Sequence, residues 1–245
     1  MLSFSNLGNM GRLGNQLFQI ASTIGSAKNN NEDYYFPEWY YNKFFKNKIP
    51  SAKYFPENIF QEKTFYYSEI KIKNSDLSGY FQSEKYWENH RDLIIEQFEF
   101  IEELIDEEKW NKIEKDCSIH VRRTDYIQKQ EYHPLQKIRY YQESIDLMKK
   151  ENCNNFLIFS DDINWCKNNF IGEEFIFVEG QTEIQDLCLM SRCKNNIIAN
   201  SSFSWWAAYL NKNKQKIIIS PLEWFGPEYK NYNTSDLYCG GWIRK

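Results

Sequence analysis

Histidine is scarce in this sequence, and cysteine never occurs in CxxC pairs. Only 3 histidines are present in 245 residues, and the 6 cysteines lie far apart, at positions 117, 153, 166, 188, 193 and 239. Zinc sites need closely spaced cysteine and histidine ligands, and disulfide frameworks need cysteines in regular pairs. The pattern therefore indicates neither a zinc site nor a disulfide framework, and it favours free thiols in a reducing compartment.

Long apolar runs and an excess of positive charge are also absent. No run of about 18 apolar residues is present, so no transmembrane segment is expected. The N-terminal residues lack a basic stretch followed by an apolar core, so we expect no secretory signal and a cytoplasmic protein. The net charge of −4 argues against nucleic acid as a partner, because binding to a phosphate backbone requires a positive surplus.

Aromatic residues are abundant instead. They make up 18% of the chain, whereas charged residues make up 26% and hydrophobic residues 42%, as in a globular protein. Aromatic faces suit stacking on bases and sugar rings, although most of them fill hydrophobic cores. The length allows one large domain or two smaller ones, and the charged stretch Glu107–Asp116 marks the expected boundary.

Strand and helix patterns alternate regularly after residue 116. The expected strands are Cys117–Val121, Phe156–Phe159, Phe175–Val178, Asn196–Ala199 and Ile217–Ser220. The expected helices are Leu135–Lys150, Asn164–Asn169, Ile184–Arg192 and Phe203–Asn211. Alternation of this kind predicts βαβ units, and therefore an α/β fold with a parallel sheet.

The N-terminal half is less regular. A short strand at Leu2–Ser5 leads through a glycine-punctuated loop, in which Gly11 and Gly14 serve the turn, to a helix whose apolar residues begin at Leu17. Short strands and loops are expected over residues 33–73, and a helix is expected over Tyr86–Asp106. The glycine loop alone is a weak signal, because it lacks the complete GxGxxG spacing.

Charged residues follow the first regular strand, in the segment His120-Val-Arg-Arg-Thr-Asp125. Ligands of open α/β sheets bind at the carboxyl ends of strands, and guanidinium groups match phosphate oxygens in pairs. Arg122 and Arg123 are therefore candidate phosphate ligands, while Asp125 could hold a guanidinium or assist a reacting hydroxyl. The alternative is a solvated salt-bridge cluster.

Two further polar segments follow strands. Ser160, Asp161 and Asp162 could accept hydrogen bonds from a guanine or ribose edge, hold manganese, or cap the helix that follows. The segment from Asn200 through Ser201, Ser202 and Phe203 opens a helix, so it could bind a pyrophosphate or serve as a simple serine cap.

Together, these segments resemble a known family. The matching motifs are Arg12-Leu-Gly-Asn-Gln-Leu-Phe18, Ser78-Gly-Tyr-Phe-Gln-Ser-Glu-Lys-Tyr86, His120-Val-Arg-Arg-Thr-Asp125, Phe159-Ser-Asp-Asp162, Leu189-Met-Ser191 and Asn200-Ser-Ser-Phe-Ser-Trp-Trp206. In this order they are similar to the bacterial α-1,2-fucosyltransferases, glycosyltransferase family 11. Pro221 followed by Trp224-Phe225 also fits, so the resemblance runs from about residue 8 to residue 225.

The resemblance implies a GT-B fold, in which two Rossmann-like domains face a cleft. We expect a reduced N-terminal acceptor-side domain at residues 1–112 and a domain that binds GDP-fucose at residues 113–245. The implied activity is inverting transfer of L-fucose from GDP-fucose to an oligosaccharide, with an α-1,2 linkage to galactose. No metal and no other cofactor are implied.

Individual positions are implied as well. By the resemblance, Arg122 and Arg123 contact the GDP phosphates, and Asp161 or Asp162 contacts the guanine or ribose. Three further residues would sit at the pyrophosphate, namely Ser201, Ser202 and Phe203. Two residues, Asn15 and Gln16, would face the cleft where donor and acceptor meet.

The chemistry of the transfer reaction suggests two candidates for the general base. Asp125 is the first candidate base for the acceptor hydroxyl and His120 the second.

One position departs from the family pattern. Before Leu-Gly-Asn-Gln the family usually has Gly-Gly, whereas this chain has Gly11-Arg12, which is more similar to the protein O-fucosyltransferases. Rival interpretations are a different nucleotide-sugar transferase, with or without a metal, and a sugar-binding module without activity.

Overall fold

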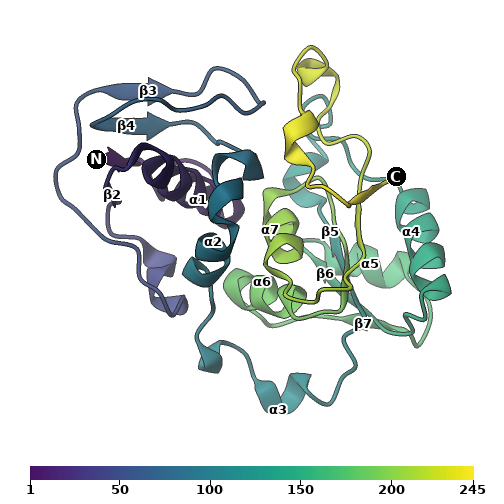
Figure 1. The fold of residues 1–245 in the computed structure, drawn as a ribbon. Coiled ribbons are helices and arrows are strands. Elements are labelled where there is room, and N and C mark those ends of the chain that lie inside the picture. Colours follow the sequence, from purple (N-terminus) through teal and green to yellow (C-terminus); the bar gives the residue numbers. More distant parts are fainter. The chain divides into compact units, whose positions relative to one another are not determined.

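The computed structural model describes all residues, 1–245. The chain divides into two compact units, which we describe separately (Figure 1). The first unit comprises Met1–Glu102 and Tyr232–Cys239, and the second comprises Glu103–Asn231 and Gly240–Lys245. None of the helices is both long enough and apolar enough to cross a membrane.

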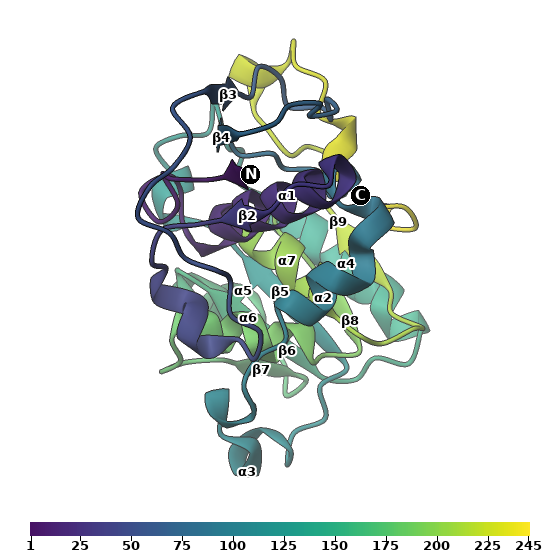
Figure 2. The same ribbon diagram turned by 60° about the vertical axis from the view of Figure 1, so that its left-hand side comes forward.

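The first unit contains a small parallel sheet and a long buried helix. Its helices and strands are β1 (Leu2–Ser3), α1 (Leu13–Asn30), β2 (Tyr34–Tyr35), β3 (Ile59–Gln61), β4 (Ser75–Ser78) and α2 (Arg91–Gln97). The strands lie in the order β2-β1-β4-β3, and α1 packs against β1 and β2 (Figure 2). A Cβ atom on Gly25 of α1 would lie 2.3 Å from the Tyr86 carbonyl oxygen, so only glycine permits this close approach.

The second unit contains a larger parallel sheet. Its helices and strands are α3 (Glu107–Trp110), β5 (Cys117–Val121), α4 (Ile138–Lys150), β6 (Phe156–Ser160), α5 (Ile163–Asn169), β7 (Phe175–Phe177), α6 (Glu183–Ser191), β8 (Asn195–Ile197), α7 (Ser202–Leu210), β9 (Ile218–Ser220) and β10 (Ile243–Arg244). The strand order is β10-β9-β8-β5-β6-β7. The chain runs outward from β5 to β7 and then returns to the other side of β5 at β8. The order therefore reverses between β5 and β8, as in doubly wound folds.

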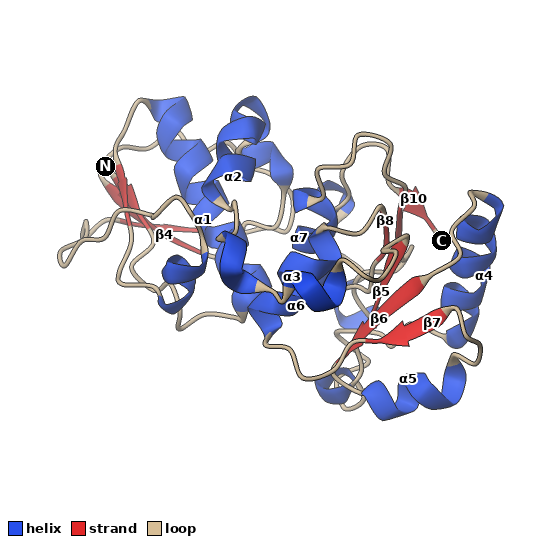
Figure 3. Ribbon diagram, turned by 90° about the horizontal axis from the view of Figure 1, so that it is seen from below, coloured by secondary structure: helices blue, strands red, loops and turns tan.

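Helices cover both faces of this sheet, with α4 and α5 on one face and α6 and α7 on the other (Figure 3). Successive residues of a strand point to opposite faces. In β5, Ile119 and Val121 belong to the same buried cluster as Tyr141 of α4. His120 points to the other face, where its ring centroid lies 5.5 Å from that of Phe203 in α7.

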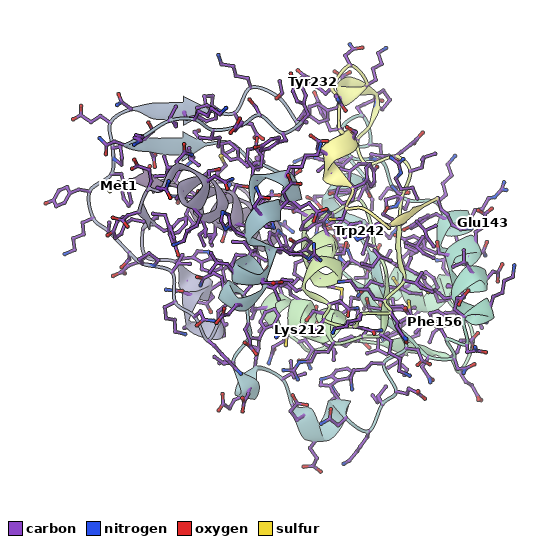
Figure 4. All side chains as sticks on the ribbon, in the orientation of Figure 1. Met1, Glu143, Phe156, Lys212, Tyr232 and Trp242 are labelled. Atoms are coloured by element: carbon purple, nitrogen blue, oxygen red, sulfur yellow. The ribbon has the colours of Figure 1, made fainter.

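Helix α4 shows why this covering is stable. Tyr141, Ile145 and Met148 recur at helical spacing and are buried. Glu143 lies on the outer side of the helix, away from the sheet, where it pairs with Arg139 at 2.6 Å (Figure 4). Burying an apolar side chain of this size contributes about 1.5–3 kcal/mol, far more than the exposed ion pair.

The expected α/β organisation with a parallel sheet is confirmed. Each strand expected after residue 116 is present and begins or ends within two residues of its expected position. The short strands and loops expected over residues 33–73 are also present. Strand β10, formed by two residues near the C-terminus, was not expected from the sequence.

The helix expected over Tyr86–Asp106 is wrong in extent, because α2 covers only Arg91–Gln97. After α2 the backbone turns to form an isolated antiparallel bridge between Phe45 and Phe100. The amide of Ile101 donates to the Phe44 carbonyl oxygen at 3.1 Å. Tertiary pairing therefore overrides the helical pattern of the apolar residues.

The charged stretch Glu107–Asp116 is helical only at its start, in α3. Its last residues extend the sheet instead. The backbone amides of Lys194 and Asn195 donate to the carbonyl oxygens of Lys115 and Asp116, each at 2.9 Å. These bonds align the beginning of β5 with β8.

Candidate functional site

Polar side chains collect at the carboxyl ends of three neighbouring strands of the second unit. Val121 at the end of β5 is paired with Ser160 at the end of β6, and Ile119 is paired with Ile197 at the end of β8. The loops that follow these strands therefore leave the sheet at the same edge. The strand order reverses here, and doubly wound sheets bind ligands at such a point.

Arg122 is held between two carboxylates. Its Nη2 lies 2.5 Å from Oδ1 of Asp125, and its Nη1 lies 3.0 Å from Oδ2 of Asp161. Its side chain is only 14% exposed. Charge-assisted hydrogen bonds of this kind are short and strong, so the guanidinium has a fixed position before any ligand binds.

Arg123 is held by a second set of contacts. Its Nε lies 3.1 Å from Oδ2 of Asp162. Its guanidinium carbon lies 4.1 Å from the ring centroid of Trp165, within the range of a cation–π interaction. The two adjacent arginines are thus fixed by different carboxylates and keep their remaining N–H groups as donors.

The two aspartates after β6 act on the loop after β5. Asp161 accepts hydrogen bonds from the Arg123 amide at 2.9 Å and from the Thr124 hydroxyl at 2.5 Å, besides its contact with Arg122. Asp162 caps α5, because it accepts from the Trp165 amide at 3.2 Å. The capping interpretation is therefore confirmed for Asp162.

Ser160 also supports this turn, because its hydroxyl accepts from the Asp162 amide at 2.9 Å. The carboxylates of Asp161 and Asp162 point at arginines, and no group of three or more His, Cys, Asp or Glu side chains is arranged to hold a metal ion. Asp162 accepts two protein hydrogen bonds and is 29% exposed, so it keeps unused acceptor positions.

The loop after β8 is fixed by Asn200. Its Nδ2 donates to the carbonyl oxygens of Pro134 and Trp224, both at 3.0 Å. Ser201 is the N-cap of α7, because its hydroxyl accepts from the Phe203 amide at 3.4 Å. The serine-cap interpretation is thus confirmed, and it leaves other N–H groups of the first turn unused.

Ser202 and Phe203 occupy the first turn of α7 and are partly exposed. The turn contains no acidic residue. A helix N-terminus carries a partial positive charge and free N–H groups, so it favours an anion. The end of β8 thus offers a second anion-attracting group beside the arginines at the end of β5.

His120 is buried in β5 and neutral. Burial, with a smaller contribution from the Arg122 charge, lowers its pKa from 6.5 to about 4. Its Nδ1 is buried without a hydrogen-bond partner, and its ring contacts Phe203. His120 therefore links the end of β5 to the first turn of α7 by packing.

His120 should make the fold sensitive to acid. The unfolded chain takes up the imidazole proton below pH 6.5, whereas the folded chain does so only near pH 4, so stability falls as the pH falls through this window. The full loss from this group is about 3 kcal/mol. Urea unfolding at pH 7 and pH 4.5 should show a smaller loss in His120→Phe than in the unsubstituted protein. Equal losses in the two proteins would contradict the assignment.

The predicted N-terminal site residues lie in the first unit. Arg12 is exposed at the N-terminal end of α1, and Gly14 is buried in the first turn. Asn15 accepts a hydrogen bond from Nε2 of Gln82 at 2.7 Å. This hydrogen bond joins the start of α1, which follows β1, to the segment after β4, and these are the two central strands of the small sheet.

Gln16 is buried and uses both ends of its amide inside the first unit. Its Oε1 accepts from Nε1 of Trp39 at 2.8 Å, and its Nε2 donates to the Gly11 carbonyl oxygen at 3.0 Å. Gly11 has a positive φ of +79°, a conformation that favours glycine. Gln16 therefore holds the glycine loop in shape.

Some residues of the site were not singled out from the sequence. Trp165 stacks on Arg123, Thr124 bonds to Asp161, and the Tyr126 hydroxyl donates to the Asn200 carbonyl oxygen at 3.0 Å. Thr124 lies within the arginine motif and Tyr126 directly follows it, so their position was a usable signal. The sequence around Trp165 contains no such signal, because Trp165 is distant from Arg123 in the sequence and contacts it only in the folded protein.

Comparison with known proteins identifies the family of this chain. The family model "Glycosyl transferase family 11" matches residues 16–245. The O-antigen biosynthesis glycosyltransferase WbnK of Escherichia coli is 34% identical over 212 residues, which are 79% of this chain and 67% of that protein. The alpha-1,2-colitosyltransferase of Escherichia coli is 38% identical over 182 residues, 69% of this chain and 62% of that protein. The chain thus spans about two thirds of the length of these relatives.

Solved structures share the fold. The NodZ α-1,6-fucosyltransferase from Bradyrhizobium, soaked with GDP-fucose, has a TM-score of 0.53 at 15% identity, over 85% of this chain and 92% of that chain. POFUT1 in complex with GDP has a TM-score of 0.56 at 12% identity, over 89% and 97%. At such low identity these likenesses concern the fold alone. The match of the family model over most of the sequence shows that the chain belongs to glycosyltransferase family 11.

Proposed function

We propose that this protein transfers L-fucose from GDP-fucose to a glycan hydroxyl, with inversion, forming an α-1,2 linkage to galactose. The observation that carries the proposal is the arginine pair at the end of β5. Arg122 and Arg123 are fixed by three aspartates at the point where the strand order reverses, beside the N-terminal end of α7. This is the chemistry that a nucleoside diphosphate requires.

The arginines would act on the leaving group. Breaking a glycosyl–phosphate bond passes through an oxocarbenium-like state, as in glycoside hydrolysis. Negative charge then grows on the β-phosphate, and a fixed cation stabilises that charge more in the transition state than in the ground state. Because its carboxylate partners already hold Arg122, it need not reorganise during the reaction.

The nucleotide would lie across the three strand ends. Ser201, Ser202 and Phe203 would offer amides of the α7 terminus to the pyrophosphate. For the guanine or ribose, Asp162 is better suited than Asp161, because Asp161 already accepts hydrogen bonds from three protein groups.

The acceptor side belongs to the same proposal. We assign acceptor binding to the N-terminal domain at residues 1–112, with Arg12, Gly14 and Asn15 at the N-terminal end of α1 and the buried Gln16 holding the glycine loop beside them, and GDP-fucose binding to residues 113–245. The GT-B organisation is part of this proposal. Asp125, partly exposed beside Arg122, is the preferred base for the acceptor hydroxyl, and the buried His120 is second.

A second donor follows from the similarity to an alpha-1,2-colitosyltransferase at 38% identity. Colitose is fucose without its 3-hydroxyl, so a GDP-colitose donor would place the same diphosphate on the same arginines. The pocket around the sugar ring, and not the arginine pair, would then distinguish the two donors. A protein O-fucosyltransferase activity and a binding module without turnover are the remaining alternatives.

The direct test is a donor and acceptor screen. We expect release of GDP from GDP-fucose in the presence of galactose-terminated oligosaccharides, an α-1,2-linked product by linkage analysis, and the same rate in EDTA. Metal independence is expected because two arginines and a helix N-terminus already meet the phosphate charge. Activity that is lost in EDTA and returns with manganese would make the aspartates metal ligands. Faster turnover of GDP-colitose would favour the second donor.

A further inference from the structure

The chain between the arginine motif and α4 is tied to the end of β8. At its start, the Tyr126 hydroxyl donates to the Asn200 carbonyl oxygen at 3.0 Å. Near its end, the Pro134 carbonyl oxygen accepts from Nδ2 of Asn200, also at 3.0 Å. One buried asparagine therefore fixes both ends of this segment.

His133 lies inside this segment and is held by aromatic rings. Its ring is stacked on that of Tyr126, with centroids 4.8 Å apart and an interplanar angle of 17°. Phe225 lies on it at 5.7 Å. Its Nδ1 is buried without a hydrogen-bond partner, so ring contacts, and not a hydrogen bond at this nitrogen, set its position.

Tyr126 connects His133 to the arginine site. The guanidinium carbon of Arg122 lies 5.5 Å from the centroid of the Tyr126 ring, within cation–π range. The same ring therefore contacts Arg122 and His133. Burial lowers the pKa of His133, which keeps the imidazole uncharged near neutral pH and spares Arg122 a second positive charge on this ring.

We propose that His133 is a positioning residue for the transferase reaction: through the Tyr126 ring it adds to the hold that Asp125 and Asp161 have on the Arg122 guanidinium. This inference rests on the proposed function. A flat, uncharged ring at position 133 keeps Tyr126 against Arg122, and Arg122 then meets the leaving phosphate in the correct place. Loss of this ring allows Tyr126 to tilt and the guanidinium to move, and small displacements of catalytic groups are costly.

Substitutions of His133 by side chains of different shape test this role. We expect His133→Ala and His133→Leu to lower kcat/KM about tenfold, mainly through kcat, because the contact matters most when charge develops. His133→Phe, which keeps a flat uncharged ring, should retain most of the activity. His90→Ala, at a partly exposed histidine of the first unit, is the matched control and should be unchanged.

Substitutions of His133 in a Tyr126→Leu variant test whether His133 acts on Arg122 through the Tyr126 ring. There the additional effect of His133→Leu should largely disappear, because non-additivity marks residues that act through one another. Normal kinetics in His133→Leu, or a Phe variant as poor as the Leu variant at an equal melting temperature, would overturn the inference. If the unsubstituted protein releases no GDP from GDP-fucose, the proposed function fails, and GDP affinity measured by calorimetry then ranks the same variants.

Discussion

Arg122→Ala is expected to lower turnover at least about 10²-fold, the usual effect of removing one preorganised donor to a developing anion. The guanidinium is fixed by Asp125 and Asp161 and is mostly shielded from solvent. Its loss removes a positive charge and also leaves two carboxylates near the phosphates. Steady-state kinetics with GDP-fucose and a galactose-terminated acceptor measure the effect.

Three further variants sharpen this result. Arg123→Ala should be comparably damaging. Arg122→Lys should stay well below the unsubstituted protein, because a lysine keeps the charge but cannot bridge two carboxylates with a planar fork. Lys150→Ala, at the exposed end of α4, should be nearly neutral. Near-normal turnover in Arg122→Ala, in protein with an unchanged melting temperature, would remove this arginine from the catalytic role.

The sheet of the second unit was predictable from the sequence because its signals are local. The apolar runs at Cys117–Val121 and Phe156–Phe159 carry their own strand pattern, and the charged residues follow them directly. A parallel sheet brings such strand ends to one edge. This shared edge is the reason that Arg122 and Asp161, which follow different strands, lie close together.

The separate roles of Asp161 and Asp162 at this edge of the sheet were not predictable from the sequence. Both Asp161 and Asp162 were candidates for capping, metal binding or base recognition. Only the fold shows that Asp162 caps α5 while Asp161 holds the loop after β5. Likewise, Gln16 looked like a ligand residue, but it bonds to Trp39, a partner distant in sequence that no local pattern indicates.

Long-range pairing also explains why the helix expected over Tyr86–Asp106 is shorter than expected. Residues after α2 have apolar spacing suitable for a helix, but the Phe45–Phe100 bridge takes their backbone elsewhere. Residues 232–239 return to the first unit through Asp236, which accepts from the Tyr67 amide at 2.9 Å and from Lys85 at 2.7 Å. No local sequence pattern indicates that Tyr67 and Lys85 are the partners of Asp236.

Selectivity for the nucleotide base is the second large effect that we expect. Guanine presents N1–H and N2–H₂ as adjacent donors, which one carboxylate can accept together. Uracil offers a single N3–H between two carbonyl oxygens, which repel a carboxylate. Charge-assisted hydrogen bonds contribute on the order of 1.5–3 kcal/mol each, so GDP should bind at least about tenfold more tightly than UDP.

Asp162 is the preferred reader of the base, because its carboxylate is partly exposed and has unused acceptor positions. Asp162→Asn is the matched variant. Asparagine also caps helices well, so α5 should persist while the negative charge is lost. The variant should lose affinity for GDP and gain little for UDP. An unchanged preference for GDP would assign base recognition to another group, with Asp161 the next candidate.

The most direct test of the GDP-fucose assignment is a calorimetric titration of the unsubstituted protein with GDP, GDP-fucose, UDP and UDP-galactose at one pH and one salt concentration. It requires no acceptor and no turnover, so it examines the strand-end site by itself. We expect binding of GDP and GDP-fucose, with an advantage of at least about tenfold over the uridine nucleotides. Affinities for GDP and UDP within a factor of about three would show that no carboxylate reads the base, and they would contradict the assignment of GDP-fucose as the donor.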